Sequence, residues 1–272
     1  MRLLTFHTEH GPRAGRLEGD VVVELDAADV GAVLAAGDLG EITETGRSHP
    51  LADLRLAPPV LAPAKVICIG QNYEAHIREE GGQLPKFPTL FNKFTRTLIG
   101  PQDPIQLPRN SEKVDWEVEL AFYVGRPIRH ASETDALAAI AGYTVLNDVS
   151  MRDWQSRTTQ WMQGKAFEST TPVGPWMVTP DEIDPLKLRV LCEVDGQVMQ
   201  DSTTADLVFK PAQIAAYISE FITLEPGDLI ATGTPSGVGN FRNPPVYLKA
   251  GQVVRTHIDG IGECVNVCES GS

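Results

Sequence analysis

The sequence lacks several features that would assign it to a specialised class of protein. It contains only four cysteines and no CxxC pair, which argues against a disulfide-rich scaffold or a zinc site. No stretch approaches the roughly 18 apolar residues of a membrane-spanning helix, so we expect no membrane partner. The N-terminal stretch MRLLTFHTEHGPRAG differs from a secretory signal, and we expect the protein to stay in the cytoplasm.

Positive charge is also scarce. The chain has 23 Lys and Arg residues against 36 Asp and Glu residues, which gives a net charge of -13, and the acidic residues are spread along it. Nucleic acid is a poor partner for such a surface. The same charge would repel an anionic small molecule, so a site for one needs local cations or a metal ion.

The order of apolar runs and turn residues predicts two unequal domains. Residues 1 to about 55 contain short alternating stretches, and the Pro-rich stretch APPVLAPAK (57–65) is typical of a linker. We therefore predict a small N-terminal β domain over 1–60 and a main domain over 61–272. Strand-like runs separated by Gly, Pro and Asp turns dominate the main domain, so we expect a mostly β member of the α+β class.

Three short helices are predicted among these strands. Asn72 is expected to cap the first one, which Gly81-Gly82 would end. A capping-box pattern precedes a second helix over roughly 133–141. The third begins at Pro211, in the first turn where proline is tolerated, and continues with apolar residues at helical spacing.

The stretch VDWEVELAFYV (114–124) has the alternating pattern of a strand. One face carries five apolar side chains, Trp116, Val118, Leu120, Phe122 and Val124. The other face carries Asp115, Glu117, Glu119 and Tyr123. Neighbouring carboxylates on one face would have Cα atoms roughly 6.6 Å apart and would repel each other. Their arrangement therefore requires an explanation.

Two explanations fit this acidic face. A half-exposed strand with a solvated polar face is the commoner one. The alternative is a divalent cation shared by Glu117 and Glu119, because Mg²⁺ prefers carboxylate oxygens. Asp148, which follows the apolar run YTVL, could supply a further oxygen from a neighbouring strand. Asp115 gains no such role, and we interpret it as a surface residue or a support behind the ligands.

A set of ordered segments strengthens the metal explanation. These segments are GQNYEAHIREE, FNK, DWEVELAFYVGR, GYTVLNDVSMRD, QGKAFE, TPVGPW, TLEPGDLIATGTPSGVG and YLKAGQVV with IDGIGE. From about residue 61 to 267 the ordered set resembles the fumarylacetoacetate hydrolase family. The resemblance implies the family's mixed β-roll fold and a homodimer. It also implies metal-ligand positions at Glu117, Glu119 and Asp148, for Mg²⁺ or Mn²⁺, with Ca²⁺ also compatible with oxygen ligands.

The resemblance extends to a catalytic dyad on a short helical lid. His76 and Glu79 match the family's histidine and glutamate at these positions. Residues three apart share one helix face, so the carboxylate can orient the imidazole as a general base. Taken alone, this spacing is more often a solvated surface. Gln71 departs from the family pattern, which more often has an apolar residue there, and we expect it to alter the entrance under the lid.

Further residues match positions that the family uses to hold its substrate. Lys165 and Arg152 would supply the cations, and Gln155 and Thr234 match neighbouring polar contacts. We interpret TGTPSGVG as a tight turn that presents Thr234, because no Lys follows as in a phosphate-binding loop. Lys93 is a weaker candidate, which we interpret as a surface charge.

These residues suggest an enzyme acting on a small anionic 2-oxo acid. The leading hypothesis is hydrolysis of a carbon–carbon bond in a short acylpyruvate or other 1,3-diketo acid. A water deprotonated by His76 would attack, and a pyruvate enolate would leave, stabilised by the metal and Lys165. Decarboxylation of oxaloacetate and isomerisation of a 2-hydroxyhepta-2,4-diene-1,7-dioate would use the same enolate. An inactive metal-binding protein or small-molecule sensor is the alternative of another class.

Overall fold

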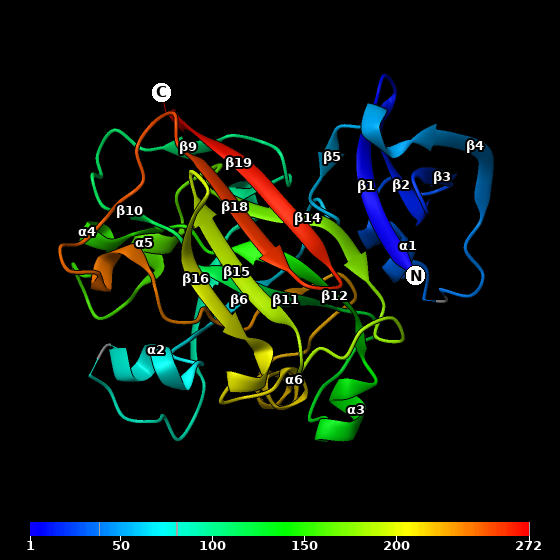
Figure 1. Ribbon diagram of the computed structural model, residues 1–272. Coiled ribbons are helices and arrows are strands. Elements are labelled where there is room, and N and C mark those ends of the chain that lie inside the picture. Colours follow the sequence, from blue (N-terminus) through cyan, green and yellow to red (C-terminus); the bar gives the residue numbers. More distant parts are fainter. Residues whose placement is uncertain (38, 80, 272) are drawn as a thin grey trace.

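Two β-sheets form the framework of the molecule in the computed structural model, which describes residues 1–37, 39–79 and 81–271 (Figure 1). The long sheet contains, in spatial order, β4 (Glu44–Pro50), β3 (Val21–Leu25), β2 (Gly11–Glu18), β1 (Arg2–Thr8), β14 (Thr171–Val178), β12 (Ile140–Asn147), β11 (Val118–Val124), β17 (Leu229–Ala231), β6 (Val66–Gly70) and β7 (Thr89–Lys93). At its side, β5 (Leu56–Ala57) pairs with β1, and β8 (Leu98–Ile99) pairs with β14.

The second sheet packs against the long one. Its order is β16 (Gln197–Thr203), β15 (Arg189–Val194), β18 (Val253–Ile258), β19 (Gly262–Ser270) and β9 (Ile105–Leu107). A separate two-stranded ladder joins β10 (Val114–Asp115) to β13 (Ser150–Met151). The main apolar core lies between the sheets and contains side chains of β11, β12, β15 and β18.

The helices are few and short. They are α1 (Val30–Ala36), α2 (Glu74–Glu79), α3 (Glu133–Leu137), α4 (Arg152–Gln155), α5 (Met162–Lys165) and α6 (Pro211–Ser219). Single 3-10 turns occur at η1 (Leu51–Asp53), η2 (Thr95–Thr97), η3 (Thr204–Asp206) and η4 (Gly239–Phe241). The predicted mostly β fold is confirmed. Within the described residues, no helix has both the length and the apolarity needed to cross a membrane.

The helix predictions need two corrections. Asn72 does not cap α2, because its side chain bonds Phe209 and the carbonyl oxygen of Thr232 instead. The helix predicted over 133–141 ends at Leu137, because the chain must then enter β12. The third helix begins at Pro211, as predicted.

The strand predicted over 114–124 is interrupted and buried on both faces. All five residues of its apolar face belong to the main core, whereas Ala121 and Tyr123 face a second core shared with the N-terminal segment. The solvated explanation for the acidic face is therefore wrong. Between β10 and β11, the backbone N–H groups of Glu117 and Val118 donate to side-chain oxygens of Asn147 and Gln200, both at 3.0 Å. These side chains satisfy the two backbone donors at the point where β11 begins.

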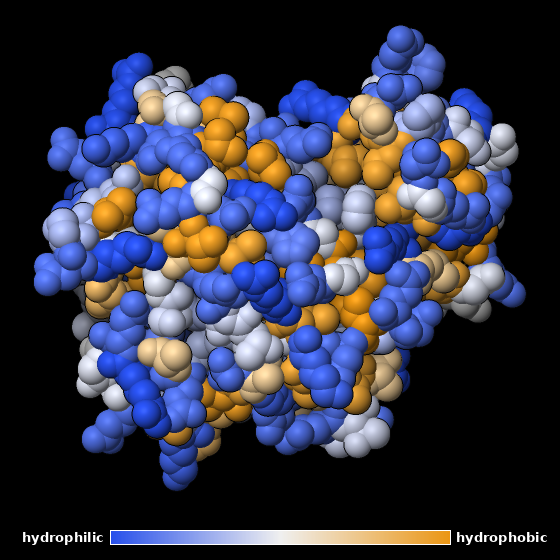
Figure 2. Space-filling model, in the orientation of Figure 1, coloured by the Kyte–Doolittle hydropathy of each residue, from blue (hydrophilic) through white to orange (hydrophobic). Residues whose placement is uncertain are grey.

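The N-terminal strands extend the long sheet, because β1 pairs antiparallel with β14. Apolar side chains of β1 and α1 share a core with β6, β11 and β17. In the view of Figure 2, polar and charged side chains cover most of the surface and apolar side chains appear in groups between them. The N-terminal segment is thus joined to the main sheet by both hydrogen bonds and apolar packing.

Candidate metal centre and active site

Three carboxylates meet where β11 and β12 pair. Glu117 precedes β11, Glu119 lies within it, and Asp148 directly follows β12. The antiparallel register places Val118 opposite Asn147, and the Asp148 N–H donates to the Glu117 carbonyl oxygen at 2.8 Å. One ligand oxygen from each carboxylate lies within 4.8 Å of the others, and all three residues are buried. This carboxylate cluster can bind a divalent metal ion.

Two lysines contact the carboxylate cluster. The Lys165 ammonium lies 2.6 Å from Glu117 Oε2 and 2.8 Å from Asp148 Oδ2. The Lys93 ammonium lies 2.7 Å from Asp148 Oδ1, and the Lys93 side chain is 0% exposed. The interpretation of Lys93 as a surface charge is therefore wrong. The alternation of TLFNK could have indicated this, since it places Lys93 on the same side of β7 as Phe91.

Lys165 reaches the cluster because α5 packs closely against α4. A Cβ atom at Gly164 would lie 2.6 Å from atoms of both Gln155 and Met151. Only glycine allows this approach, which places the last residue of α5 beside the carboxylates. The Phe91 ring lies 4.9 Å from the Lys165 ammonium and covers it with an aromatic face.

Arg152 links the cluster to Asp115. Arg152 Nε lies 2.8 Å from Asp115 Oδ2, and Nη2 lies 2.7 Å from Glu117 Oε1. Asp115 is fully buried and also accepts the N–H groups of Gly239 and Asn240, at 2.7 and 2.9 Å. The surface interpretation of Asp115 is thus wrong, and its contact with Arg152 is consistent with the interpretation as a support. Burial disfavours the Arg152 charge, but Asp115 and Glu117 outweigh burial and raise the pKa of Arg152.

The pKa values of two carboxylates in the cluster, Asp148 and Glu119, shift in opposite directions. Burial alone would raise the pKa of Asp148, but Lys165 and Lys93 hold it at about 2. Glu119 behaves in the opposite way, because burial and then the charges of Asp148 and Glu117 raise its pKa well above the usual value. The charge of Lys165 and the Gly233 N–H, which donates at 2.7 Å, oppose this shift only in part.

The charge balance fits a bound cation. In the described part of the chain the ion pairs of the three buried cations go to other carboxylates, and Glu119 has none. With all four carboxylates ionised, they face three buried cations, which leaves one negative charge unbalanced. The residues concerned are Asp115, Glu117, Glu119, Asp148, Lys93, Arg152 and Lys165. A divalent cation would reverse the sign of this charge and favour an anionic substrate.

The predicted dyad lies on α2, next to the cluster. His76 Nδ1 is 3.0 Å from Glu79 Oε2, and the His76 side chain is nearly buried. Glu79 also accepts the Gly237 N–H at 3.2 Å, and the Phe241 ring meets the imidazole edge-on at 5.9 Å between centroids. The helix is thus held against the loop that contains Thr234.

Thr234 and Gln155 complete the set of predicted residues. Thr234 donates to the Val118 carbonyl oxygen at 2.9 Å, and Gln155 accepts from Arg152 Nη1 at 2.9 Å. Gln200 was not predicted. It donates to Thr234 and accepts from the Val118 N–H, so it ties the loop to β11. Gln200 lies on β16 in the other sheet, and its sequence context carries no signal of this role.

All but one of the predicted site residues line one small cavity of about 40 Å³ or contribute to the cluster beside it. The cavity lining includes His76, Glu117, Glu119, Arg152, Gln155, Lys165 and Thr234. Asp148 does not line the cavity but pairs with Lys165, which does, and Glu79 likewise pairs with the lining residue His76. A larger cavity of about 400 Å³ adjoins it and shares Gln71, Arg152, Gln155 and Trp161 in its lining. We refer to these as the inner and outer cavities.

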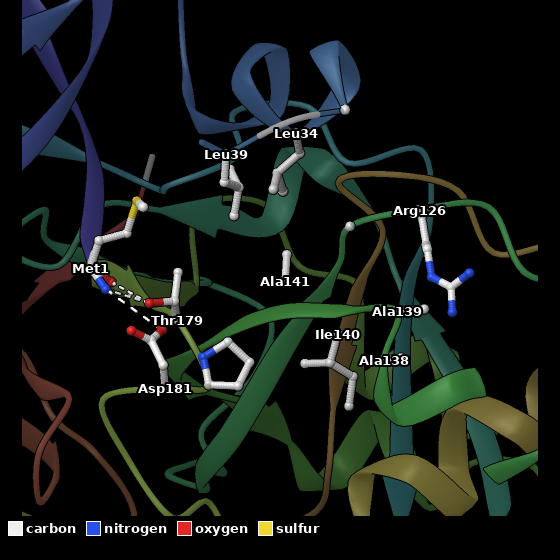
Figure 3. A pocket seen from close by; sticks show the side chains of 13 residues that line it. Met1, Leu34, Leu39, Arg126, Ala138, Ala139, Ile140, Ala141, Thr179 and Asp181 are labelled. Atoms are coloured by element: carbon white, nitrogen blue, oxygen red, sulfur yellow. Dashed lines mark hydrogen bonds and ion pairs between the residues drawn. The ribbon is translucent and has the colours of Figure 1, made fainter. Parts of the chain in front are cut away.

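A further cavity of about 380 Å³ lies between the N-terminal segment and the main sheet (Figure 3). Leu34 and Leu39 lie on one side of it and Ala138 to Ala141 on the other, while Met1 contacts Thr179 and Asp181. The group of metal-ligating side chains found among the described residues lies elsewhere, at the inner cavity.

Comparisons with known proteins identify relatives over nearly the whole chain. Residues 65–269 match the model described as fumarylacetoacetate (FAA) hydrolase C-terminal, and residues 1–59 match the one described as Rv2993c-like, N-terminal. The chain is 42% identical to "Oxaloacetate tautomerase fahd2, mitochondrial" of Xenopus laevis, over 98% of this chain and 89% of that protein. It is also 42% identical to "Oxaloacetate tautomerase FAHD2A, mitochondrial" of Homo sapiens, over 98% and 91% of the two chains.

Solved structures are similar over the whole chain. The 5-carboxymethyl-2-hydroxymuconate delta-isomerase from Mycobacterium smegmatis has a TM-score of 0.86 and 38% identity, with 99% of this chain and 100% of that chain covered. The 2-hydroxyhepta-2,4-diene-1,7-dioate isomerase from Mycobacterium marinum has a TM-score of 0.83 and 36% identity, with 99% and 98% covered. The resemblance seen in the sequence is confirmed, and the chain belongs to the fumarylacetoacetate hydrolase family.

Proposed function

We propose that this protein moves a proton at C3 of a short 2-oxo acid and so interconverts its keto and enol forms. The observation that carries the proposal is the shared inner cavity, which is lined by both the His76 imidazole and the cations Lys165 and Arg152. A group that exchanges protons thus lies next to groups that stabilise negative charge. An enolate-forming reaction needs both.

The residues have separate roles in this proposal. Arg152, Gln155 and Thr234 bind the substrate carboxylate and the neighbouring carbonyl. Burial disfavours the charge on Lys165, but Asp148 and Glu117 outweigh burial and raise its pKa. Lys165 therefore stays protonated and acts as a fixed positive charge rather than as a base.

His76, oriented by Glu79, transfers the proton. In the keto-to-enol direction His76 removes a proton from C3, and the C–H electron pair becomes the C2–C3 double bond. The carbonyl oxygen gains the negative charge beside Lys165 and takes the proton back from the His76 imidazolium, which gives the enol and regenerates the imidazole. In the reverse direction His76 removes the enol O–H proton and the imidazolium delivers it to C3.

The carboxylate cluster would hold a metal ion beside these residues. Its three oxygen donors and its unbalanced negative charge fit Mg²⁺ or Mn²⁺, and we propose these as the cofactor. A divalent cation, when bound by Glu117, Glu119 and Asp148, supplies further positive charge for stabilising an enolate oxygen.

The relatives support a proton transfer in particular. Those described above are named oxaloacetate tautomerase or are isomerases of unsaturated 2-hydroxy acids. Tautomerases and isomerases of such acids share the movement of a proton along the carbon chain.

Carbon–carbon hydrolysis of an acylpyruvate is the second candidate, and decarboxylation of oxaloacetate uses the same enolate. The outer cavity of about 400 Å³ favours hydrolysis, because it has room for an acyl group and an attacking water next to the inner cavity, which His76 lines. In this case His76 would deprotonate the water, and a pyruvate enolate would leave beside Lys165.

Three assays on Mg²⁺-loaded protein distinguish these reactions. The enol of oxaloacetate is followed by its ultraviolet absorbance, pyruvate release reports decarboxylation, and loss of acetylpyruvate reports hydrolysis. We expect His76→Ala to slow the enol–keto step by about 10²- to 10⁴-fold, and the exposed-site variant His10→Ala to match the unmodified protein. An unaccelerated enol–keto step, or full activity in His76→Ala, would contradict the proposal. Cleavage of acetylpyruvate without tautomerisation would favour the hydrolase.

A further inference from the structure

The outer cavity contains a cation that the proposed reaction does not use. A cavity of about 40 Å³ is small beside the roughly 300 to 1,000 Å³ of ordinary ligand pockets, so a substrate in the inner cavity must extend outward. The outer cavity offers about 400 Å³ next to it. Lys113 lines only the outer cavity, whereas Arg152 lines both.

The fold fixes Lys113 next to the active site. It directly precedes β10, and the β10–β13 ladder pairs Val114 with Met151. The Arg152 N–H donates to the Lys113 carbonyl oxygen at 2.9 Å. The side chain of Lys113 is exposed, and no carboxylate among the described residues forms an ion pair with its ammonium. Lys113 thus adds an unbalanced positive charge to a cavity that is continuous with the site.

The rest of the outer cavity has a mixed lining. Trp161 and Phe241 supply aromatic surface near the inner cavity, and Ser156, Thr158 and Asn240 supply polar groups. A Cβ atom at Gly70 would lie 2.1 Å from the Trp161 ring, so the glycine allows the indole to lie at this boundary. Such a lining suits a short hydrocarbon segment that ends in a charged group.

We propose that Lys113 binds the distal carboxylate of a dicarboxylic 2-oxo acid, or of the corresponding 2-hydroxy-dienoic acid, that is long enough to extend from the inner into the outer cavity. The inference rests on the proposed function, because the 2-oxo end of the same molecule occupies the inner cavity. Lys113 is then a specificity residue, which distinguishes these diacids from acids that lack the distal carboxylate. A solvated surface lysine, the commoner role for such a residue, would make no such distinction.

The test compares two substrates that differ only in the distal carboxylate. Exchange of the C3 protons of 2-oxoheptanedioate and of 2-oxoheptanoate is followed by NMR in D₂O with Mg²⁺-loaded protein. We expect Lys113→Gln to lower kcat/KM for the diacid by about three- to tenfold, and Lys113→Glu to lower it further. Both variants should leave the monoacid unchanged within about twofold. Lys249→Gln, at another exposed lysine outside both cavities, serves as the matched control.

The outcomes separate this inference from the proposed function. Equal effects of Lys113→Gln on both acids, or no effect on either, would overturn the role of Lys113 while exchange itself still supports the proposed function. If neither acid exchanges its C3 protons, the proposed function fails. Calorimetric titration with the two acids then still tests whether Lys113 binds the distal carboxylate. Tighter binding of the diacid that disappears in Lys113→Gln would support its role, and equal dissociation constants would overturn it.

Discussion

Glu24 on β3 and Glu119 on β11 lie in the same sheet with four strands between them, and they are 2% and 1% exposed. Burial would raise the pKa of Glu24, but the Glu24 carboxylate pairs with Arg47 and lies 2.9 Å from His49 Nε2. These partners lower its pKa. Glu119 has no ion pair within the described chain, and burial raises its pKa well above the usual value.

The difference shows what distinguishes a structural carboxylate from a functional one. Both partners of Glu24 come from β4, the strand paired with its own, so this contact is complete within the fold. At the carboxylate cluster, the lysines and Arg152 balance the neighbours of Glu119 but not Glu119 itself. A buried carboxylate left with excess negative charge is costly unless a cation from outside the chain joins it. Burial of a glutamate alone therefore indicates nothing about function, whereas its partners do.

The largest expected change in stability comes from removing one cation at the carboxylate cluster, compared with removing one beside Glu24. In protein freed of metal by EDTA, Lys165→Met should lower the free energy of unfolding by about 3 to 5 kcal/mol, because Glu117 and Asp148 remain buried with less compensation. Arg47→Met should cost only about 1 kcal/mol or less, since the Arg47 side chain is 61% exposed and His49 remains. Urea denaturation measures both. Similar losses in the two variants would remove the distinction between the regions.

Replacing Glu119 or Glu24 by glutamine, the neutral isostere, should change the free energy of unfolding in opposite directions. Without metal, Glu119→Gln should raise the free energy of unfolding by about 1 to 2 kcal/mol, because the ionised form is disfavoured in the fold. Glu24→Gln should lower it by about 1 to 3 kcal/mol, because charged hydrogen bonds are lost. The measurement is urea denaturation at pH 7 in EDTA. A loss of stability in Glu119→Gln would contradict the excess of negative charge at the cluster.

Parts of this comparison could be predicted from the sequence. The alternation of 114–124 placed Glu117 and Glu119 together, and the ordered segments pointed to Asp148. Lys93 and Asp115 were harder, because a charged residue in a short motif is usually exposed. The buried Asp115 carboxylate accepts hydrogen bonds from the backbone of Gly239 and Asn240, more than a hundred residues away in the chain. Such contacts depend on how loops return to the site, which local pattern does not encode.

The pH dependence of stability gives a smaller effect. The folded-state pKa of Glu24 is below its ordinary value of 4.5, so its stabilising contribution is present in full above pH 4.5. It is lost as the pH falls through the lower folded-state pKa. The difference in free energy of unfolding between the unmodified protein and Glu24→Gln should therefore shrink below pH 4.5. Denaturation at a series of pH values checks this, and a difference that grows toward low pH would contradict the ion pairing of Glu24.

Binding of Mn²⁺ tests the central claim most directly. Electron paramagnetic resonance can count the Mn²⁺ ions bound per chain in the unmodified protein and in Glu119→Gln and Glu24→Gln. The carboxylate cluster predicts one ion per chain, retained in Glu24→Gln and lost or bound at least about tenfold more weakly in Glu119→Gln. Equal binding by Glu119→Gln and the unmodified protein, or no binding by either, would contradict the assignment of Glu117, Glu119 and Asp148 as the metal site.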